Sequence, residues 1–279
     1  MKEDKMAFDV IFATAVAHEL DSVLRGARIE KVYQPSKEEI LLFCRVGRET
    51  KKLIISACPS SARVCFTDSQ AENPAAPPML CMLLRKHLSG AQIEEVGTVG
   101  FERAIKITFS CHDELGFECR RYIIAEIMGK YSNIIFAGDD GGKMKILGVT
   151  KPVDFTTSRV RQVLPGMIYE APPPQEKLDP LKETYKGFIS RFENYPAGKD
   201  ADRFFIDTYL GFSPAVAREL VCRAGAVGRC ASETDPEKLY RAFSALMENV
   251  RNREFVPYMA LGLGGEPEEF SYTEITYLP

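Results

Sequence analysis

The spacing of apolar and polar residues changes along the chain, from runs typical of strands to the helical period of 3.6 residues. After a helical stripe over Phe8–Leu24, short runs rich in β-branched residues alternate with turn residues as far as Val149. Runs of this kind predict antiparallel strands. The expected strands are Arg28–Gln34, Ile40–Val46, Leu53–Ala57, Ala62–Phe66, Gln92–Val96, Arg103–Ser110, Phe117–Ala125, Ser132–Ala137 and Lys145–Val149.

Proline and glycine mark the remaining boundaries. Pro78 suits the first position of a helix and Gly90 the position after its end, so one helix is predicted between the strands. The proline-rich stretch Ala171–Gln175 is the expected domain boundary. Beyond it, helices are predicted at Leu181–Phe192, Asp200–Leu210, Ser213–Gly225 and Asp235–Arg251, and extended, pairing segments at Phe255–Leu261 and Phe270–Leu278.

Together these elements predict the α+β class. An antiparallel, β-rich domain is expected over residues 1–172, an all-α domain over 176–254 and an extended segment over 255–279. A helix pair joined by a glycine-containing turn can direct backbone N–H groups at a phosphate, although most such pairs are plain packing units.

The hairpin over Arg120–Ala137 gathers polar groups at one tip. In a strand, Glu126 alternates with apolar neighbours, and a carboxylate in that position is costly unless it has a partner. Lys130, Ser132 and Asn133 follow in the turn. One interpretation is a surface turn with a salt-bridged Glu126, and the other is a binding surface.

Other candidate residues also allow two interpretations. Asp9 lies in the first turn of a helix, where a carboxylate complements the helix dipole. Arg85 and Lys86 lie in a last helical turn, where they complement the dipole or face a phosphate. Glu102 and Arg103 lie where a turn becomes a strand, which makes them a solvated strand end or an outward-facing pair.

Composition narrows the function classes. The 279 residues are 45% hydrophobic and 27% charged, which is ordinary for a soluble globular chain. No apolar run is long enough for a membrane span, and the charged start MKEDKMAFDV is unlike a signal peptide, so a cytoplasmic protein is expected. The eight cysteines are scattered without a CxxC pair, which predicts reduced thiols rather than a metal site.

Charge and motifs leave the chemistry open. The net charge of −3 signals no general affinity for nucleic acid, although a local basic cluster can still steer RNA. No GxGxxG, P-loop, GxSxG or HExxH motif is present. We therefore predict no catalytic residue, no metal and no cofactor.

Eight stretches carry a resemblance to the NFACT family. They are MAFDV, RIEKVYQP, LIISACPSSARVCFT, NPAAPPMLCMLLRKHL, GFERAIKITF, EIMGKYSNIIF, LPGMIYEAPPP and GFSPAVAREL. The resemblance implies an NFACT-N domain similar in fold to the N-terminal domain of formamidopyrimidine-DNA glycosylases, followed by a helix-hairpin-helix domain. A coiled coil and an RNA-binding domain follow in the family, so the chain is expected to be part of a longer protein.

The resemblance also implies a function in ribosome-associated quality control. Expected partners are tRNA, with alanyl-tRNA as the recruited species, and a large ribosomal subunit obstructed by peptidyl-tRNA. The outcome would be C-terminal alanine tailing of the stalled chain, with the bond made by the ribosome, so the chain is not expected to be an enzyme. No membrane or DNA partner is expected.

The family's tRNA-contacting signature is an N-terminal aspartate together with an Asp-Arg pair. Asp9 matches the first, and Glu102-Arg103 matches the second with glutamate in place of aspartate. The longer side chain shifts the carboxylate. The nucleic-acid-binding residues implied or proposed are Asp9, Arg85, Lys86, Glu102, Arg103, Glu126, Lys130, Ser132 and Asn133.

Two other functions compete with this one. The expected fold suggests a DNA glycosylase, but such enzymes use an N-terminal proline, and this chain starts Met1-Lys2-Glu3. The family's older name, fibronectin-binding protein A, suggests binding of fibronectin or fibrinogen at a cell surface. The absence of a signal peptide argues against secretion.

Overall fold

The computed structural model describes residues 8–69, 72–173, 175–262 and 264–278. Contacts between residues divide the chain into a β-unit, residues 16–173, and a helical unit, residues 1–15 with 174–279. The α+β class is confirmed. The domain limits predicted from the sequence stay a prediction, since this division assigns the first fifteen residues to the helical unit.

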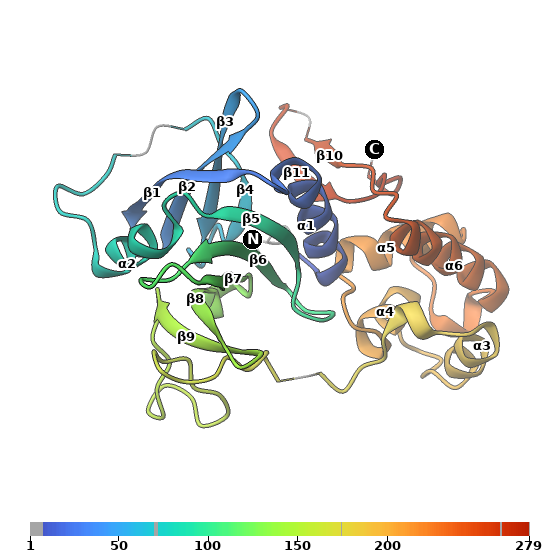
Figure 1. The fold of residues 1–279 in the computed structure, drawn as a ribbon. Coiled ribbons are helices and arrows are strands. Elements are labelled where there is room, and N and C mark those ends of the chain that lie inside the picture. Colours follow the sequence, from blue (N-terminus) through green and yellow to red (C-terminus); the bar gives the residue numbers. More distant parts are fainter. Residues whose placement is uncertain (1–7, 70–71, 174, 263, 279) are drawn as a thin grey trace. The chain divides into compact units, whose positions relative to one another are not determined.

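The β-unit is built on one antiparallel sheet in the order β4-β3-β2-β1-β5-β6-β7-β8-β9 (Figure 1). Each run of β-formers became a strand, because alternation of side chains and turn residues are local signals. The bounds are β1 Arg28–Ser36, β2 Glu39–Val46, β3 Glu49–Ser56, β4 Arg63–Phe66, β5 Gln92–Thr98, β6 Ala104–His112, β7 Glu118–Glu126, β8 Asn133–Asp140 and β9 Lys143–Val149.

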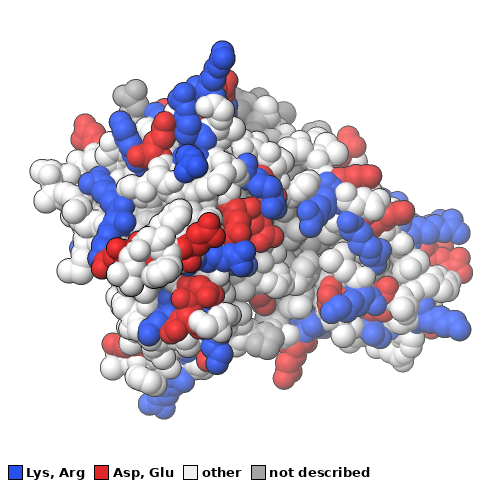
Figure 2. Space-filling view, viewed as in Figure 1, with Lys and Arg blue, Asp and Glu red and all other residues white. Residues whose placement is uncertain are grey.

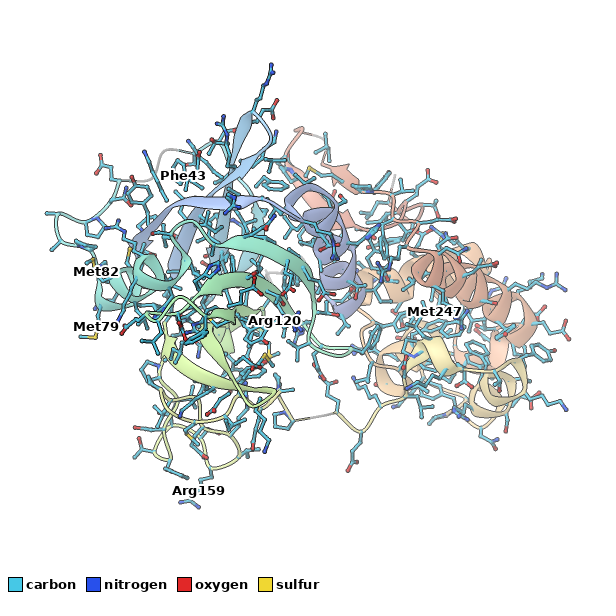
Figure 3. The ribbon with its side chains drawn as sticks, viewed as in Figure 1. Phe43, Met79, Met82, Arg120, Arg159 and Met247 are labelled. Carbon is cyan, nitrogen blue, oxygen red and sulfur yellow. The ribbon has the colours of Figure 1, made fainter. Side chains whose placement is uncertain are left out.

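Helix α2 (Met79–Leu88) packs against β1, β6 and β9. Because β1 and β9 are far apart in the strand order, the sheet must curve around this helix. A Cβ added to Gly148 of β9 would lie 2.8 Å from Cδ1 of Leu80, so the helix approaches the strand closely. Met79 and Met82 lie on the outward side of α2 (Figure 3).

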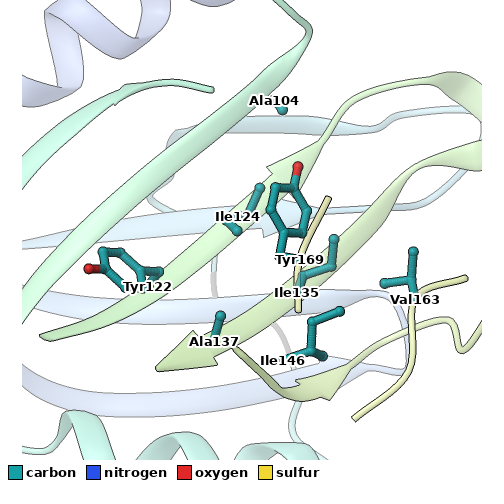
Figure 4. Packing of buried hydrophobic residues seen from close by; sticks show 8 residues of the cluster. All are labelled: Ala104, Tyr122, Ile124, Ile135, Ala137, Ile146, Val163 and Tyr169. Atoms are coloured by element: carbon teal, nitrogen blue, oxygen red, sulfur yellow. The ribbon is translucent and has the colours of Figure 1, made fainter. Parts of the chain in front are cut away.

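The segment after β9 folds back over the sheet. The N–H of Ile146 donates to the carbonyl of Met167 at 2.8 Å, and the N–H of Tyr169 donates to the carbonyl of Met144 at 2.7 Å. Val163 and Tyr169 thereby enter a buried cluster with residues of β6, β7, β8 and β9 (Figure 4). Both faces of β7 are therefore buried along Tyr122–Glu126.

The helical unit contains α3 (Tyr185–Glu193), α4 (Ala201–Thr208), α5 (Pro214–Arg223), α6 (Pro236–Asn252) and a hairpin of β10 (Tyr258–Leu261) with β11 (Pro267–Ser271). Helix α1 (Val10–Leu24) contributes its first residues to this unit and the remainder to the β-unit. The predicted starts at Ser213-Pro214 and Asp235-Pro236 are confirmed, since each cap side chain accepts an N–H from the first turn.

The core of the helical unit is a cluster of aromatic rings around Phe188, which is completely buried. Its ring centroid lies within 6.4 Å of six others, those of Phe192, Phe204, Phe205, Tyr209, Tyr240 and Phe243. Aromatic side chains bury large areas and attract one another edge to face. This cluster is therefore a central part of the apolar core of the helical unit.

Phe188→Ala should lower the free energy of unfolding by about 3–5 kcal/mol, because it leaves a large cavity in a packed core. Urea unfolding followed by circular dichroism measures the change. Phe155→Ala is the matched control, because that ring is 70% exposed and its loss should change stability by less than about 0.5 kcal/mol. Equal effects of the two substitutions would contradict the assignment of the core.

Candidate nucleic-acid interface

Glu126 ends β7 with a carboxylate that is only 2% exposed. Arg161 donates to it with both terminal nitrogens, at 3.1 and 2.6 Å, and the hydroxyl of Tyr169 donates at 2.9 Å. The partner that a buried carboxylate requires is therefore a two-pronged guanidinium plus a phenol. Burial, together with the Glu126 carboxylate, raises the pKa of Tyr169, which keeps its proton available for this bond.

The turn after β7 is held by the next two predicted residues. Ser132 is completely buried, and its hydroxyl oxygen accepts the N–H of Met128 at 2.8 Å. Asn133 is 3% exposed and bonds to both the N–H and the carbonyl of Lys151, at 3.0 and 2.7 Å. These amide and hydroxyl groups thus close the turn from inside instead of projecting from it.

The exposed part of the turn is the 3-10 helix η1 (Gly129–Tyr131). Gly129 has φ +57°, a left-handed conformation that suits glycine. Tyr131 is 71% exposed, and the Lys130 ammonium lies 4.8 Å from its ring centroid. A cation beside an exposed ring can bind a phosphate and stack on an unpaired base.

Arg103 lies at the base of the same turn, because its carbonyl accepts the N–H of Ile127 at 2.8 Å. Its side chain is half-buried and makes no hydrogen bond or ion pair with any residue that the structure describes. Burial raises the pKa of Glu102, and the neighbouring Arg103 opposes that shift. The guanidinium therefore keeps its donors for a ligand.

In the helical unit, Asp9 caps α1 and is 6% exposed. Its Oδ1 accepts the N–H of Phe12 at 2.8 Å. Burial raises the pKa of Asp9 to about 6, although hydrogen bonds from Phe12, Ser213 and Ile11 favour the charged form. Asp9 is therefore the residue that caps α1 and not, as predicted, a residue of its first turn, and any RNA contact stays a prediction.

Arg85 and Lys86 already have partners within the β-unit. Arg85 donates from Nε to the carbonyl of Val32 at 2.8 Å, and its guanidinium carbon lies 5.3 Å from the ring centroid of Tyr33. Lys86 forms an exposed ion pair with Glu114. Arg85 therefore helps to hold α2 against β1, and Lys86 is the more accessible of the two.

Metal and membrane sites find no support in the part of the chain that the structure describes. It has no cluster of three or more potential His, Cys, Asp or Glu ligands and no helix long and apolar enough to cross a membrane. All eight cysteines are free thiols, as predicted. Acidic and basic side chains are interspersed on the face that Figure 2 shows.

Residues 9–279 match the family model described as NFACT N-terminal and middle domains. The chain belongs to the NFACT family. It is 36% identical to the Rqc2 homolog RqcH of Bacillus subtilis, over 98% of this chain and 46% of that protein. The Rqc2 homolog RqcH of Streptococcus pneumoniae is 41% identical over 63% of this chain and 32% of its own length. The chain thus spans less than half the length of these curated NFACT relatives.

Solved NFACT structures share the fold. The N-terminal part of the fibronectin/fibrinogen-binding protein of Streptococcus suis superimposes with a TM-score of 0.79 at 28% identity, over 98% of this chain and 92% of that one. The N-terminal domain of fibronectin-binding protein PavA from Streptococcus pneumoniae gives 0.70 at 30% identity, over 96% and 91%.

In this NFACT chain, the structure divides the predicted residues into two kinds. Arg103 and Lys130 present free or exposed cations at one end of the β-unit. Glu126, Ser132 and Asn133 are buried and satisfied internally. Their polar atoms are already bonded within the chain, so their predicted direct contact with RNA finds no support in this arrangement and stays a prediction. Nothing places Asp9 relative to these groups, since it lies in the other unit.

Sequence reasoning missed three residues of this end of the β-unit. Arg161 and Tyr169 complete the bonds of Glu126, and Tyr131 is the exposed ring beside Lys130. One signal was available, because a glutamate among apolar neighbours requires a cation. No rule of residue spacing identifies which arginine pairs with Glu126, because Arg161 lies 35 residues further along the chain.

Arg161→Met should lower the free energy of unfolding by about 3–5 kcal/mol, because it leaves the Glu126 carboxylate buried without a cation. The double variant Glu126→Gln/Arg161→Met should recover most of this loss, since neither charge remains. Chemical denaturation of all four proteins in the cycle gives the coupling energy. Additive effects would show that the two side chains do not interact.

The control for this cycle is Arg120→Met in the exposed pair with Glu94, whose two side chains are 60% and 39% exposed. Water and salt screen an exposed pair, so the unfolding midpoint should hardly change. A loss as large as that of Arg161→Met would contradict the distinction between buried and exposed pairs.

Asp9 predicts a dependence of stability on pH. Its pKa is raised from 3.8 to about 6 in the folded chain, so its contribution is complete below pH 3.8 and is lost as the pH rises through 6. Relative to the native chain, Asp9→Asn should gain up to about 3 kcal/mol between pH 4 and pH 7. Asparagine keeps the cap. Urea titrations at several pH values test this, and a pH-independent difference would contradict it.

Proposed function

We propose that this chain is the N-terminal part of a ribosome-associated quality-control factor that binds tRNA. Three kinds of observation support the proposal: membership of the NFACT family, 36% identity to the Rqc2 homolog RqcH of Bacillus subtilis, and the geometry at one end of the β-unit. The observation that carries the RNA contact is the Arg103 guanidinium, which has no partner among the described residues and lies beside the exposed turn of Lys130.

Each group has a proposed role. Arg103 binds a phosphate or a base edge with its planar set of donors. Lys130 adds a phosphate contact, and Tyr131 stacks on an unpaired base. Glu102 orients Arg103 or accepts a hydrogen bond from a base or a ribose hydroxyl, because a carboxylate repels phosphate. Asp9 would act in the same way from the helical unit.

The wider activity belongs to the same proposal. The factor binds a large ribosomal subunit carrying peptidyl-tRNA, brings alanyl-tRNA to it and supports alanine tailing, in the cytoplasm. The ribosome makes each peptide bond, so these side chains need only hold RNA, and their arrangement requires no nucleophile or metal. Segments beyond the 279 residues would contribute further contacts.

A second candidate is binding of fibronectin or fibrinogen. The similar structures from Streptococcus suis and Staphylococcus aureus are described as fibronectin/fibrinogen-binding and fibrinogen-binding proteins, and the latter has a TM-score of 0.76 at 28% identity. An Arg103 variant assayed both on tRNA and on immobilised fibronectin separates the two functions.

Arg103→Ala should weaken tRNA binding by roughly 1–3 kcal/mol, because a two-pronged contact to RNA is lost. The melting temperature should hardly change, since the side chain has no partner among the described residues to leave unsatisfied. Filter binding or fluorescence anisotropy with tRNA measures the affinity, and duplex DNA of matched length is the competitor.

Arg120→Ala is the matched control, because it removes an exposed arginine of β7 that is already paired with Glu94. Both variants should be measured over a range of salt. The affinity of the native chain should fall steeply with salt. Loss of a phosphate contact at Arg103 should reduce the slope of log K against log salt concentration by about one. Unchanged tRNA affinity in a folded Arg103→Ala variant would remove this residue from the interface.

A further inference from the structure

Two cysteines face each other across the hairpin formed by β6 and β7. Cys111 is the direct partner of Cys119 in the register of the two strands, and their Sγ atoms lie 3.7 Å apart. The Cys111 thiol also donates to the carbonyl of Cys119 at 3.4 Å. Both residues are free thiols. The hairpin thus holds two nucleophilic sulfur atoms together that the proposed RNA contact does not use.

The backbone spacing at this pair suits a disulfide. The N–H of Asp113 donates to the carbonyl of Phe117 at 2.9 Å beside the turn. Cys111 and Cys119 lie two residues further along each strand, so they form a hydrogen-bonded pair, whose Cα atoms are typically about 5.5 Å apart. Disulfides join Cα atoms that are about 4.4–6.8 Å apart, so rotation of the two side chains is enough to bring the sulfur atoms into bonding distance.

The two thiols differ in their access to solvent. Cys111 is 6% exposed, whereas Cys119 is partly exposed. Burial raises the pKa of Cys111 to about 12, the neighbouring Cys119 thiol adds to the shift, and Arg121 opposes it. Because the thiolate is the reactive form, Cys111 reacts poorly with reagents from solution. An oxidant therefore reaches the pair through Cys119.

We propose that Cys111 and Cys119 are a redox modification site, which a low-molecular-weight disulfide such as oxidised glutathione converts into an intrachain disulfide. The Cys119 thiolate attacks one sulfur of the oxidant, which forms a mixed disulfide and releases one glutathione. Cys111 then attacks the Sγ of Cys119, and the second glutathione leaves. The two thiol hydrogens and two electrons of the protein pass to the two released glutathione molecules.

This site is separate from the proposed RNA interface. It adjoins the turn between β6 and β7, whereas Arg103 and Glu126 lie at the opposite end of these strands. Glu114 of the turn forms an ion pair with Lys86 of α2, so the disulfide would fix the turn that α2 contacts. In a reducing compartment the pair stays as thiols, and the disulfide forms under oxidising conditions.

The test is incubation of the 279-residue chain with oxidised glutathione at mildly alkaline pH, followed by trapping of the remaining thiols with iodoacetamide. Chymotrypsin cleaves after Leu115 and Phe117, which lie between the two cysteines and are exposed. Mass spectrometry of the non-reduced digest should find the peptides of Cys111 and Cys119 joined to each other without glutathione. This link should exceed any other intrachain link at least about tenfold, because proximity raises the effective concentration of the second thiol.

Cys58→Ser is the matched control. Hydrogen bonds from Ser60 and Ser61 lower the pKa of Cys58, so this partly exposed thiol should take up glutathione through its reactivity alone. Its loss should leave the link between Cys111 and Cys119 unchanged. Cys111→Ser should instead leave glutathione bound at Cys119, and Cys119→Ser, at the more exposed position, should abolish the link.

Circular dichroism of every chain before oxidation shows whether it is folded. Glutathione that accumulates on Cys119 of the folded native chain without closure would overturn the proposal. Links of equal yield among several cysteine pairs would overturn it too, because oxidation would then not depend on the register of β6 and β7. Loss of tRNA affinity on closure would contradict the separation of this site from the RNA interface.

Discussion

The end of the β-unit that we propose as the interface depends on one buried carboxylate. Glu126 closes β7 at 2% exposure, and such a group is stable only when its charge and its lone pairs are both satisfied. Arg161 and Tyr169, 35 and 43 residues further along the chain, provide the bonds. They draw the segment after β9 over the sheet, and this segment buries the second face of β7.

The same interaction decides what the turn after β7 can present. With the segment after β9 held in place, the backbone of Lys151 forms hydrogen bonds with the side chain of Asn133. The polar groups of the turn are then bonded within the chain. Lys130 and Tyr131 remain outside, with Arg103 attached to the base of the turn. The turn beneath these groups is closed by its own hydrogen bonds, so its backbone needs little reordering in the proposed RNA contact.

Local arrangement therefore matters more than total charge in this NFACT chain. The net charge is −3, and acidic and basic groups are interspersed on the face that Figure 2 shows, so net charge alone does not account for the proposed RNA binding. The proposed RNA binding therefore depends on a few local donors rather than on total charge. The Arg103 guanidinium, which has no hydrogen bond or ion pair with any described residue, is one such donor. Asp9 belongs to the helical unit, where its raised pKa of about 6 reflects the cost of burying a helix cap.

The sequence alone determined most of the secondary structure, the α+β class and the need of Glu126 for a partner, because periodicity, helix-start signals and desolvation act on neighbouring residues. Only the tertiary structure decided that Arg161 and Tyr169 meet that need and that Ser132 and Asn133 face inward. These outcomes depend on which distant segment covers which face of the sheet. Hydrophobic spacing reports that a face is buried, and it carries no information on what buries it.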